Sequence, residues 1–154
     1  MSARAGFTLV EVLISVAIAV FLITGIYTVL NVANASWSVD MGMLDLSQQA
    51  RQAMDGCLRE LRQSKSSGIS ITNGGAKVEF SIPNVANSIA YYLQNNQLIR
   101  EHPAGTEKIL ANSLSSLTFS LSGNVFSIQL GMAKTVQNRE LSFSLFEKVR
   151  LRNE

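Results

Sequence analysis

Residues 6–37 read GFTLVEVLISVAIAVFLITGIYTVLNVANASW, and this stretch decides the fold of the chain. No charged residue occurs between Glu11 and Asp40. As an α-helix, the run from Val12 to Leu30 is about 28 Å long, close to the ~30 Å hydrocarbon core of a bilayer. The sequence therefore predicts a helix that spans a membrane in its first half. The residues assigned to the bilayer include Val12, Leu13, Ile14, Val16, Ile18, Val20, Phe21, Leu22 and Ile23.

Glu11 is the unusual residue, because an ionised carboxylate in hydrocarbon costs at least about 2.5 kcal/mol. One interpretation is a signal peptide with Arg4 as its basic region and Ala33-Asn34-Ala35 as the cleavage site, which would release a secreted soluble protein. The apolar run is longer than such a signal requires. A second interpretation is a plain anchor with Arg4 in the cytoplasm, and it leaves Glu11 unexplained.

A third interpretation uses Gly6, Phe7 and Glu11 together with the apolar run. This pattern resembles the class III signal of type IV pilin-like proteins, which include type IV pilins and the pseudopilins of secretion and competence systems. The resemblance implies that residues 1–6 are a leader, that prepilin peptidase cleaves between Gly6 and Phe7, and that Phe7 is N-methylated. Residues 7–35 would then form the membrane helix and, after assembly, the core of a filament.

The resemblance supplies a reason for Glu11. Cleavage creates an α-amino group on Phe7 that is cationic at neutral pH. In a filament of parallel helices this amine can approach the Glu11 carboxylate of an adjacent subunit. Removing one partner of such a pair leaves an unpaired buried ion, so the pair can define the axial register of the subunits.

The helical pattern continues beyond the apolar run. Apolar or small residues recur at steps of three or four, at Met43, Leu46, Ala50, Met54, Cys57 and Leu61. We expect one helix from Phe7 to about Gln63, whose amphipathic part, within residues 36–66, packs on a globular domain. Gly25, Gly42 and Gly56 each disfavour helix by up to about 1 kcal/mol, so local loosening is expected there.

Residues 67–154 change from a helical period to alternation, which is typical of strands. Tight turns are expected at 73–75, 95–96 and 123–124. The expected strands are 69–72, 77–82, 89–93, 97–100, 117–121, 125–130, 141–145 and 149–152, combined into an antiparallel meander of five to seven strands. The fold class is therefore α+β: a long N-terminal helix packed on a C-terminal antiparallel β domain, as in pilins.

Several chemistries find no support in the sequence. The net charge is +2, with 13 basic and 11 acidic residues, so nothing favours nucleic acid. Cys57 is the one cysteine and fits a buried apolar position, and His102 is the one histidine and is expected in a loop. No catalytic or metal-binding motif is present, so we expect no enzyme, no cofactor and no metal.

Residues 85–153 loosely resemble J-class minor pseudopilins of type II secretion and W-type minor pilins. The resemblance implies a minor filament subunit, with a tip or initiation role as a further expectation. Its partners would be other subunits, prepilin peptidase, the inner-membrane assembly platform and, before assembly, lipid. Its N-terminus would be cytoplasmic and its β domain periplasmic or extracellular. A competence pseudopilin, or an adhesin that binds DNA or a surface, is the alternative within this family.

Overall fold

The computed structural model describes residues 8–151. Within this range the chain has one α-helix, α1 (Leu9–Leu61), two short 3-10 helices, η1 (Ser66–Gly68) and η2 (Asn73–Gly75), and eight strands. The chain divides into two units between Ser38 and Val39, inside α1, and each unit is described by itself. The predicted helix is confirmed over its described part and ends two residues before the expected Gln63.

The first unit is the apolar part of α1, up to Ser38. Its large apolar side chains are all exposed, and the nine residues assigned to the bilayer lie between 52% and 83% exposed. By length and composition α1 contains a segment able to cross a membrane, and none of that segment is buried. Apolar side chains at this density need a lipid or protein environment, because water solvates them poorly.

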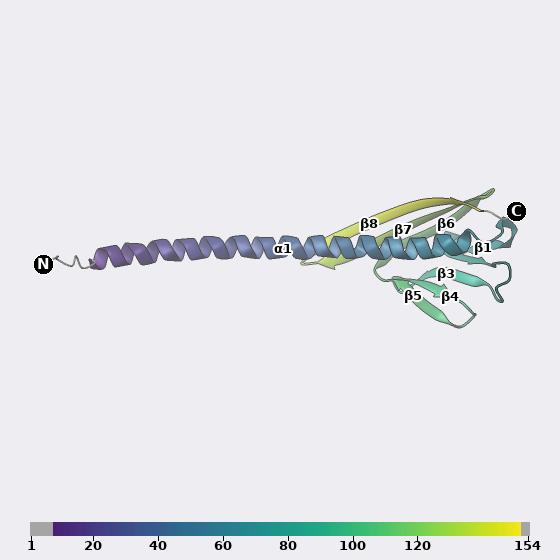
Figure 1. Ribbon diagram of the computed structural model, residues 1–154, viewed down its shortest axis with the longest axis horizontal. Coiled ribbons are helices and arrows are strands. Elements are labelled where there is room, and N and C mark those ends of the chain that lie inside the picture. The colour runs from purple at the N-terminus through teal and green to yellow at the C-terminus, as the bar shows by residue number, and fades with distance from the viewer. Residues whose placement is uncertain (1–7, 152–154) are drawn as a thin grey trace. The chain divides into compact units, whose positions relative to one another are not determined.

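The second unit holds α1 from Val39 onward and two antiparallel sheets, which lie on different sides of this part of the helix (Figure 1). The five-stranded sheet has the order β1-β2-β3-β4-β5 and the three-stranded sheet the order β6-β7-β8. The strands are β1 (Ile69–Thr72), β2 (Lys77–Phe80), β3 (Ile89–Gln94), β4 (Gln97–Glu101), β5 (Glu107–Ala111), β6 (Leu114–Ser122), β7 (Val125–Val136) and β8 (Arg139–Arg150).

Two-residue turns connect three of the strand pairs. Asn95 and Asn96 join β3 to β4 with φ of 50° and 59°, and Gln137 and Asn138 join β7 to β8 with φ of 49° and 61°. Positive φ at both central residues matches the right-handed twist of the flanking strands, and asparagine tolerates it better than most residues. Gly123 begins the β6–β7 turn with a φ of 59°. The expected turns at 95–96 and 123–124 are thus confirmed, and residues 73–75 join β1 to β2 as the 3-10 helix η2.

The core forms where the amphipathic half of α1 meets both sheets. Leu46, Ala50, Met54, Cys57 and Leu61 are buried, which confirms most of the predicted stripe. Met43 is 39% exposed, so its assignment to the stripe is wrong. From the sheets the core receives mainly the large buried side chains Phe80, Ile89, Tyr91, Leu98, Leu114, Phe126, Ile128, Leu130 and Met132.

Gly42 occupies the position next to Met43 and is buried. A Cβ atom at Gly42 would lie 2.9 Å from Leu141 Cδ1 and 3.0 Å from Val136 Cγ2. The glycine therefore lets the β7–β8 hairpin approach the helix closely, whereas the sequence had suggested a loosened helix at this position.

The strand predictions were correct in type and incomplete in number. Eight strands in two sheets replace the expected single meander of five to seven strands. β2 ends at Phe80 rather than Ile82, and the expected strands 141–145 and 149–152 are one strand, β8. Strand β5 was not predicted, because Glu107-Lys108-Ile109-Leu110-Ala111 does not alternate between apolar and polar residues.

Candidate functional site

The N-terminus of α1 carries the residue that the sequence singled out, Glu11. Thr8 precedes the helix, and its backbone N–H and its hydroxyl both donate to Glu11 Oε2, each at 2.9 Å. In return, the Glu11 backbone N–H donates to Thr8 Oγ1 at 3.3 Å. This reciprocal arrangement is a capping box, which satisfies backbone donors that the first helical turn leaves without partners.

The capping box gives Glu11 a role within its own chain that sequence reasoning missed. The spacing Thr8-Leu9-Val10-Glu11 followed by an apolar run is the sequence signal that could have revealed it. A carboxylate in the first turn also interacts favourably with the positive end of the helix dipole. Glu11 thus stabilises the start of the helix before any neighbour is present. The contact of its carboxylate with a Phe7 amine of an adjacent subunit stays a prediction.

Gly6, Phe7 and the leader 1–6 lie outside the described residues. The nine predicted membrane residues form one exposed, uncharged surface around α1. Ser15, Thr24 and Thr28 interrupt this surface only weakly, because their hydroxyls donate to backbone oxygens four residues earlier, at 2.7–2.9 Å.

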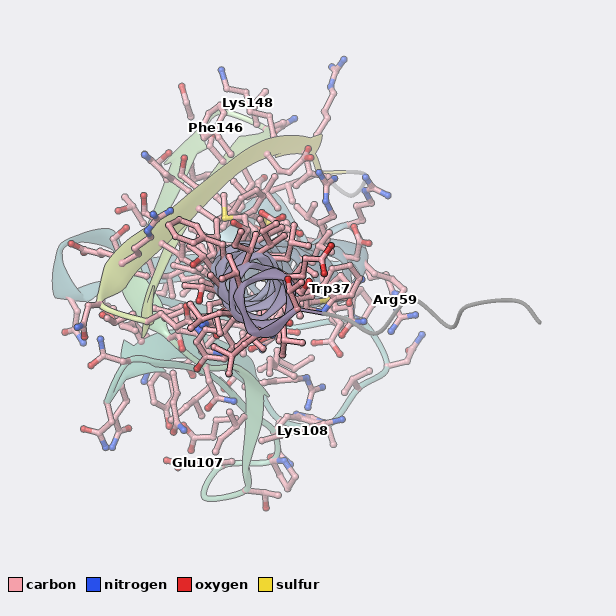
Figure 2. All side chains as sticks on the ribbon, turned by 90° about the vertical axis from the view of Figure 1, so that its left-hand side faces the viewer. Trp37, Arg59, Glu107, Lys108, Phe146 and Lys148 are labelled. Carbon is pink, nitrogen blue, oxygen red and sulfur yellow. The ribbon has the colours of Figure 1, made fainter. Side chains whose placement is uncertain are left out.

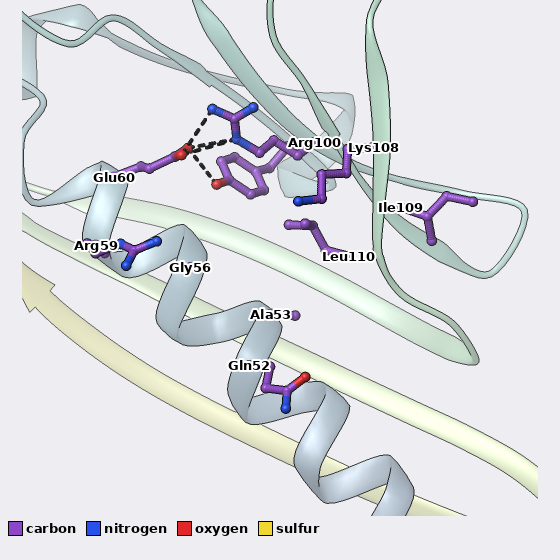
Figure 3. Close-up of a pocket in the computed structure, with 10 residues that line it drawn as sticks. Gln52, Ala53, Gly56, Arg59, Glu60, Arg100, Lys108, Ile109 and Leu110 are labelled. Atoms are coloured by element: carbon purple, nitrogen blue, oxygen red, sulfur yellow. Dashed lines mark hydrogen bonds and ion pairs between the residues drawn. The ribbon is translucent and has the colours of Figure 1, made fainter.

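A second polar cluster lies in the other unit, between the end of α1 and the five-stranded sheet. Arg100 Nε contacts Glu60 Oε1 and Oε2 at 3.2 and 3.0 Å, and Arg100 Nη2 lies 3.0 Å from Oε1. The Tyr91 hydroxyl donates to Glu60 Oε2 at 2.7 Å. Figure 3 shows Glu60 on the helix reaching toward these side chains of the sheet.

The electrostatics of this cluster favour a structural role. Burial raises the pKa of the Tyr91 phenol, and its hydrogen bond to Glu60 raises it further. The neutral phenol is therefore held as a donor at physiological pH. Burial also raises the pKa of the nearby Cys57 thiol, which opposes thiolate formation and makes the residue unreactive.

A pocket of about 400 Å³ adjoins the cluster. Its lining residues are Gln52, Ala53, Gly56, Arg59, Glu60, Tyr91, Arg100, Lys108, Ile109 and Leu110. The lining contains three cationic residues, Arg59, Arg100 and Lys108, and one carboxylate, Glu60, which already contacts Arg100.

His102 is absent from the lining of this pocket, and its Nδ1 contacts the Ser88 carbonyl oxygen at 3.3 Å. No group of three or more potential metal ligands occurs among residues 8–151.

The two adjacent tyrosines of β3 divide between core and surface. Tyr91 is 1% exposed, whereas Tyr92 on the other face of β3 is partly exposed. The Tyr92 hydroxyl donates to Glu107 Oε1 at 2.7 Å, and the Lys77 amine lies 5.5 Å from the ring centroid. The bond to Glu107 raises the pKa of Tyr92 to about 12.

Comparison with known protein families gives one match, at the N-terminus. Residues 1–27 match the family described as prokaryotic N-terminal methylation motif. Comparison with curated proteins and with solved structures gives no match. The chain therefore carries a prepilin-type methylation motif, and its N-terminal helix is consistent with membrane anchoring.

Proposed function

We propose that this chain is a non-enzymatic subunit of a pilus-like filament, made as a membrane-anchored precursor and processed between Gly6 and Phe7. The observation that carries the proposal is the methylation motif at residues 1–27, which continues into the exposed apolar surface of α1. A filament core of parallel helices would cover this surface, as lipid does before assembly. Within the class, we assign the chain to the minor subunits of type II secretion or type IV pilus systems.

The proposed assembly uses Glu11 twice. Before assembly its carboxylate caps α1 through Thr8, which lowers the cost of placing it at the membrane surface. After cleavage, the cationic amine of a neighbour's Phe7 offers a stronger, charged partner. The capped carboxylate needs no rearrangement of the helix to accept it, because a carboxylate accepts several hydrogen bonds at once.

The β domain would supply contacts specific to this subunit, and the assembly platform and prepilin peptidase would act on the N-terminal region. Supporting this division, the charged residues of the chain gather after Asp40, apart from Arg4 and Glu11. The Glu60–Arg100–Tyr91 cluster belongs to the domain's own stability rather than to a reaction site.

The test is the chemistry of the mature N-terminus. The full chain is produced in membranes with and without a prepilin peptidase, and its N-terminal peptide is analysed by mass spectrometry. We expect N-methylated phenylalanine at position 7 when the peptidase is present. Gly6→Leu is expected to remain full-length, whereas Ala3→Leu, in the same leader, should be processed normally. A mature chain beginning at Ser36 would overturn the proposal and establish an ordinary secreted protein.

A further inference from the structure

The inference starts from the two outer strands β5 and β8. β5 ends the five-stranded sheet and β8 ends the three-stranded sheet. An edge strand presents backbone N–H and C=O groups that another chain can pair with. β8 is a 12-residue strand without proline or glycine, so nothing in its sequence blocks such pairing.

Both edges also present an exposed apolar side chain. Ile109 on β5 is 52% exposed and Phe146 on β8 is 54% exposed. They are the most exposed large apolar side chains of the two sheets among the described residues. In both strands the apolar residue adjoins a pair of opposite charges: Glu107-Lys108 precedes Ile109, and Glu147-Lys148 follows Phe146.

These residues are complementary in one antiparallel register. If Ile109 lies opposite Phe146, then Lys108 lies opposite Glu147 and Glu107 lies opposite Lys148. Directly opposed side chains of an antiparallel pair interact, and opposite charges or apolar pairs stabilise it. A shift by two residues in one direction sets Ile109 against Lys148, and a shift in the other direction sets Glu107 against Phe146, so either loses the apolar pair.

The faces of the two strands match in the same register. Lys108 lies opposite Arg100, which contacts Glu60 of the helix, whereas Glu107 accepts from Tyr92 on the other face of the sheet. Ile109, two residues after Glu107, therefore faces away from α1. On β8, Leu145 and Val149 pack into or against the core, and Phe146 between them is exposed. The pairing therefore joins inner face to inner face and outer face to outer face, which strand pairing requires.

The directions of β5 and β8 follow from the contacts that fix each strand. β5 ends at Ala111, which lies opposite Leu98, close to the β3–β4 turn. β6 begins at the same turn, because the Leu114 N–H donates to the Asn96 carbonyl oxygen at 2.8 Å. The β7–β8 turn lies near Gly42 of α1, where Val136 and Leu141 pack, and Figure 1 shows β8 running from there beside the helix toward its C-terminal end.

Through β7, strand β8 runs in the same direction as β6 and opposite to β5. The helix runs opposite to β5 and therefore with β8. The Asn112 N–H, just past the end of β5, donates to the side-chain oxygen Oε1 of Gln49, and Glu60 contacts Arg100, which lies opposite Lys108 near the start of β5. Antiparallel pairing of β5 from one copy with β8 of another thus leaves their α1 segments within residues 39–61 parallel. Copies anchored in one membrane need this orientation, whereas a symmetric antiparallel β8–β8 pair would reverse one helix.

Figure 2 shows Phe146 and Lys148 on the opposite side of the second unit from Glu107 and Lys108. A contact between two different surfaces on opposite sides does not close on itself after two copies, so it can repeat. We propose that the β5 edge of one copy pairs with the β8 edge of the next copy, with Ile109 opposite Phe146, to form a continuous sheet between adjacent subunits. The proposal rests on the proposed function for the parallel orientation of the copies, and it requires runs of at least two adjacent copies.

The first test is disulfide trapping in membranes that contain the full chain and the prepilin peptidase. Two differently tagged forms, one with Ile109→Cys and the other with Phe146→Cys, are co-expressed and oxidised. Directly opposed residues bring their Cβ atoms within about 5 Å, close to the span of a disulfide. We expect a mixed dimer from the pair, none from either form alone, and a ladder of larger products when one chain carries both substitutions.

The second test changes the charges with the trapping cysteines in place. Lys108→Glu in the Ile109→Cys form should lower the yield of mixed dimer about fivefold, because it sets a carboxylate against Glu147. Glu147→Lys in the Phe146→Cys form should restore the yield. Lys65→Glu is the matched control, since Lys65 is also exposed and lies outside both edges, and it should leave the yield unchanged.

The outcomes separate this proposal from the proposed function. The mass of the mature chain in the same membranes reports processing independently of trapping. Normal processing at Phe7 without a mixed dimer overturns the edge pairing and leaves the filament proposal in place. Equal cross-linking by Phe146→Cys alone overturns it as well, because that result requires a β8–β8 contact. A mixed dimer without processing would preserve the edge pairing and contradict the filament proposal.

Discussion

Glu60 and Arg100, which are 40 residues apart in sequence, join the end of α1 to strand β4 through contacts of 3.0–3.2 Å. The side chains are 23% and 21% exposed, so water screens the ion pair only in part. Tyr91 completes the arrangement by donating to the same carboxylate. One carboxylate therefore holds two residues of the sheet against the helix.

Removing this carboxylate should destabilise the β domain. We expect Glu60→Ala to lower the free energy of unfolding by about 1–3 kcal/mol, because it leaves the buried Tyr91 hydroxyl and the Arg100 guanidinium without their acceptor. Denaturant unfolding of the full chain in detergent, followed by far-ultraviolet circular dichroism, measures the change in the free energy of unfolding. Asp55→Ala, at an exposed position of the same helix, is the control. Equal effects of the two substitutions would contradict the structural role of Glu60.

Substitution of Gly42 should reveal how closely the β7–β8 hairpin approaches the helix. Gly42→Leu is expected to cost about 1–3 kcal/mol of stability, since its side chain must displace Leu141 and Val136. Adding Leu141→Ala should recover part of the loss. Gly56→Ala is the matched control: no atom lies within 4 Å of its added Cβ, so the gain in helix propensity should stabilise the chain by up to about 1 kcal/mol. A neutral Gly42→Leu substitution would be inconsistent with this packing.

The Glu11→Gln variant should distinguish the role of Glu11 in capping the helix from the role of its negative charge in assembly. A glutamine at this position preserves the capping box with Thr8 but removes the charge that a cationic amine would meet. We expect the variant to insert in the membrane with a normal helix and to be incorporated into filaments at least tenfold less than the parent chain. The ratio of filament-bound to membrane-bound chain, from quantitative immunoblots, measures the effect.

Thr8→Val provides the complementary variant, because it removes the hydroxyl of the cap and keeps the Glu11 charge. Its incorporation should fall much less than that of Glu11→Gln. If Glu11→Gln assembles normally in the native system, the intersubunit role of the charge is refuted and capping alone accounts for the residue.

The Tyr92 phenol should lose its proton at a higher pH than an ordinary tyrosine does. Its hydrogen bond to Glu107 raises the pKa to about 12 from an ordinary value of 10. The folded chain thus holds this proton more tightly than the unfolded chain, and the stabilisation is complete below pH 10 and lost as the pH rises through about 12. The difference in phenolate absorbance between the parent chain and Tyr92→Phe gives the titration of this residue alone.

Glu107→Gln should move the Tyr92 titration toward pH 10, because the carboxylate that opposes phenolate formation is gone. Glu79→Gln, on neighbouring strand β2, is the control and should leave the midpoint in place. An unchanged midpoint in Glu107→Gln would show that another group raises the Tyr92 pKa.

The helix, the strand type and the turns could be predicted because each depends on local sequence. Uncharged residues from Val12 to Leu30 leave helix as the conformation that satisfies the backbone in lipid. Asn95-Asn96 and Gly123-Asn124 predict tight turns, since these residues accept positive φ. β5 escaped prediction because its chain supplies no alternation, and pairing with β4 alone makes it a strand.

By itself the sequence determined the methylation motif at residues 1–27, the apolar surface of α1, and most of the predicted stripe of buried helix residues. These features follow from residue type and spacing. Tertiary structure alone decided that Glu60 contacts Arg100 and Tyr91, and that Leu141 packs closely against Gly42. It also decided that β5 and β8 are edge strands. Those relationships join residues far apart in the chain, and their geometry depends on which strands pair and how the sheets pack on the helix.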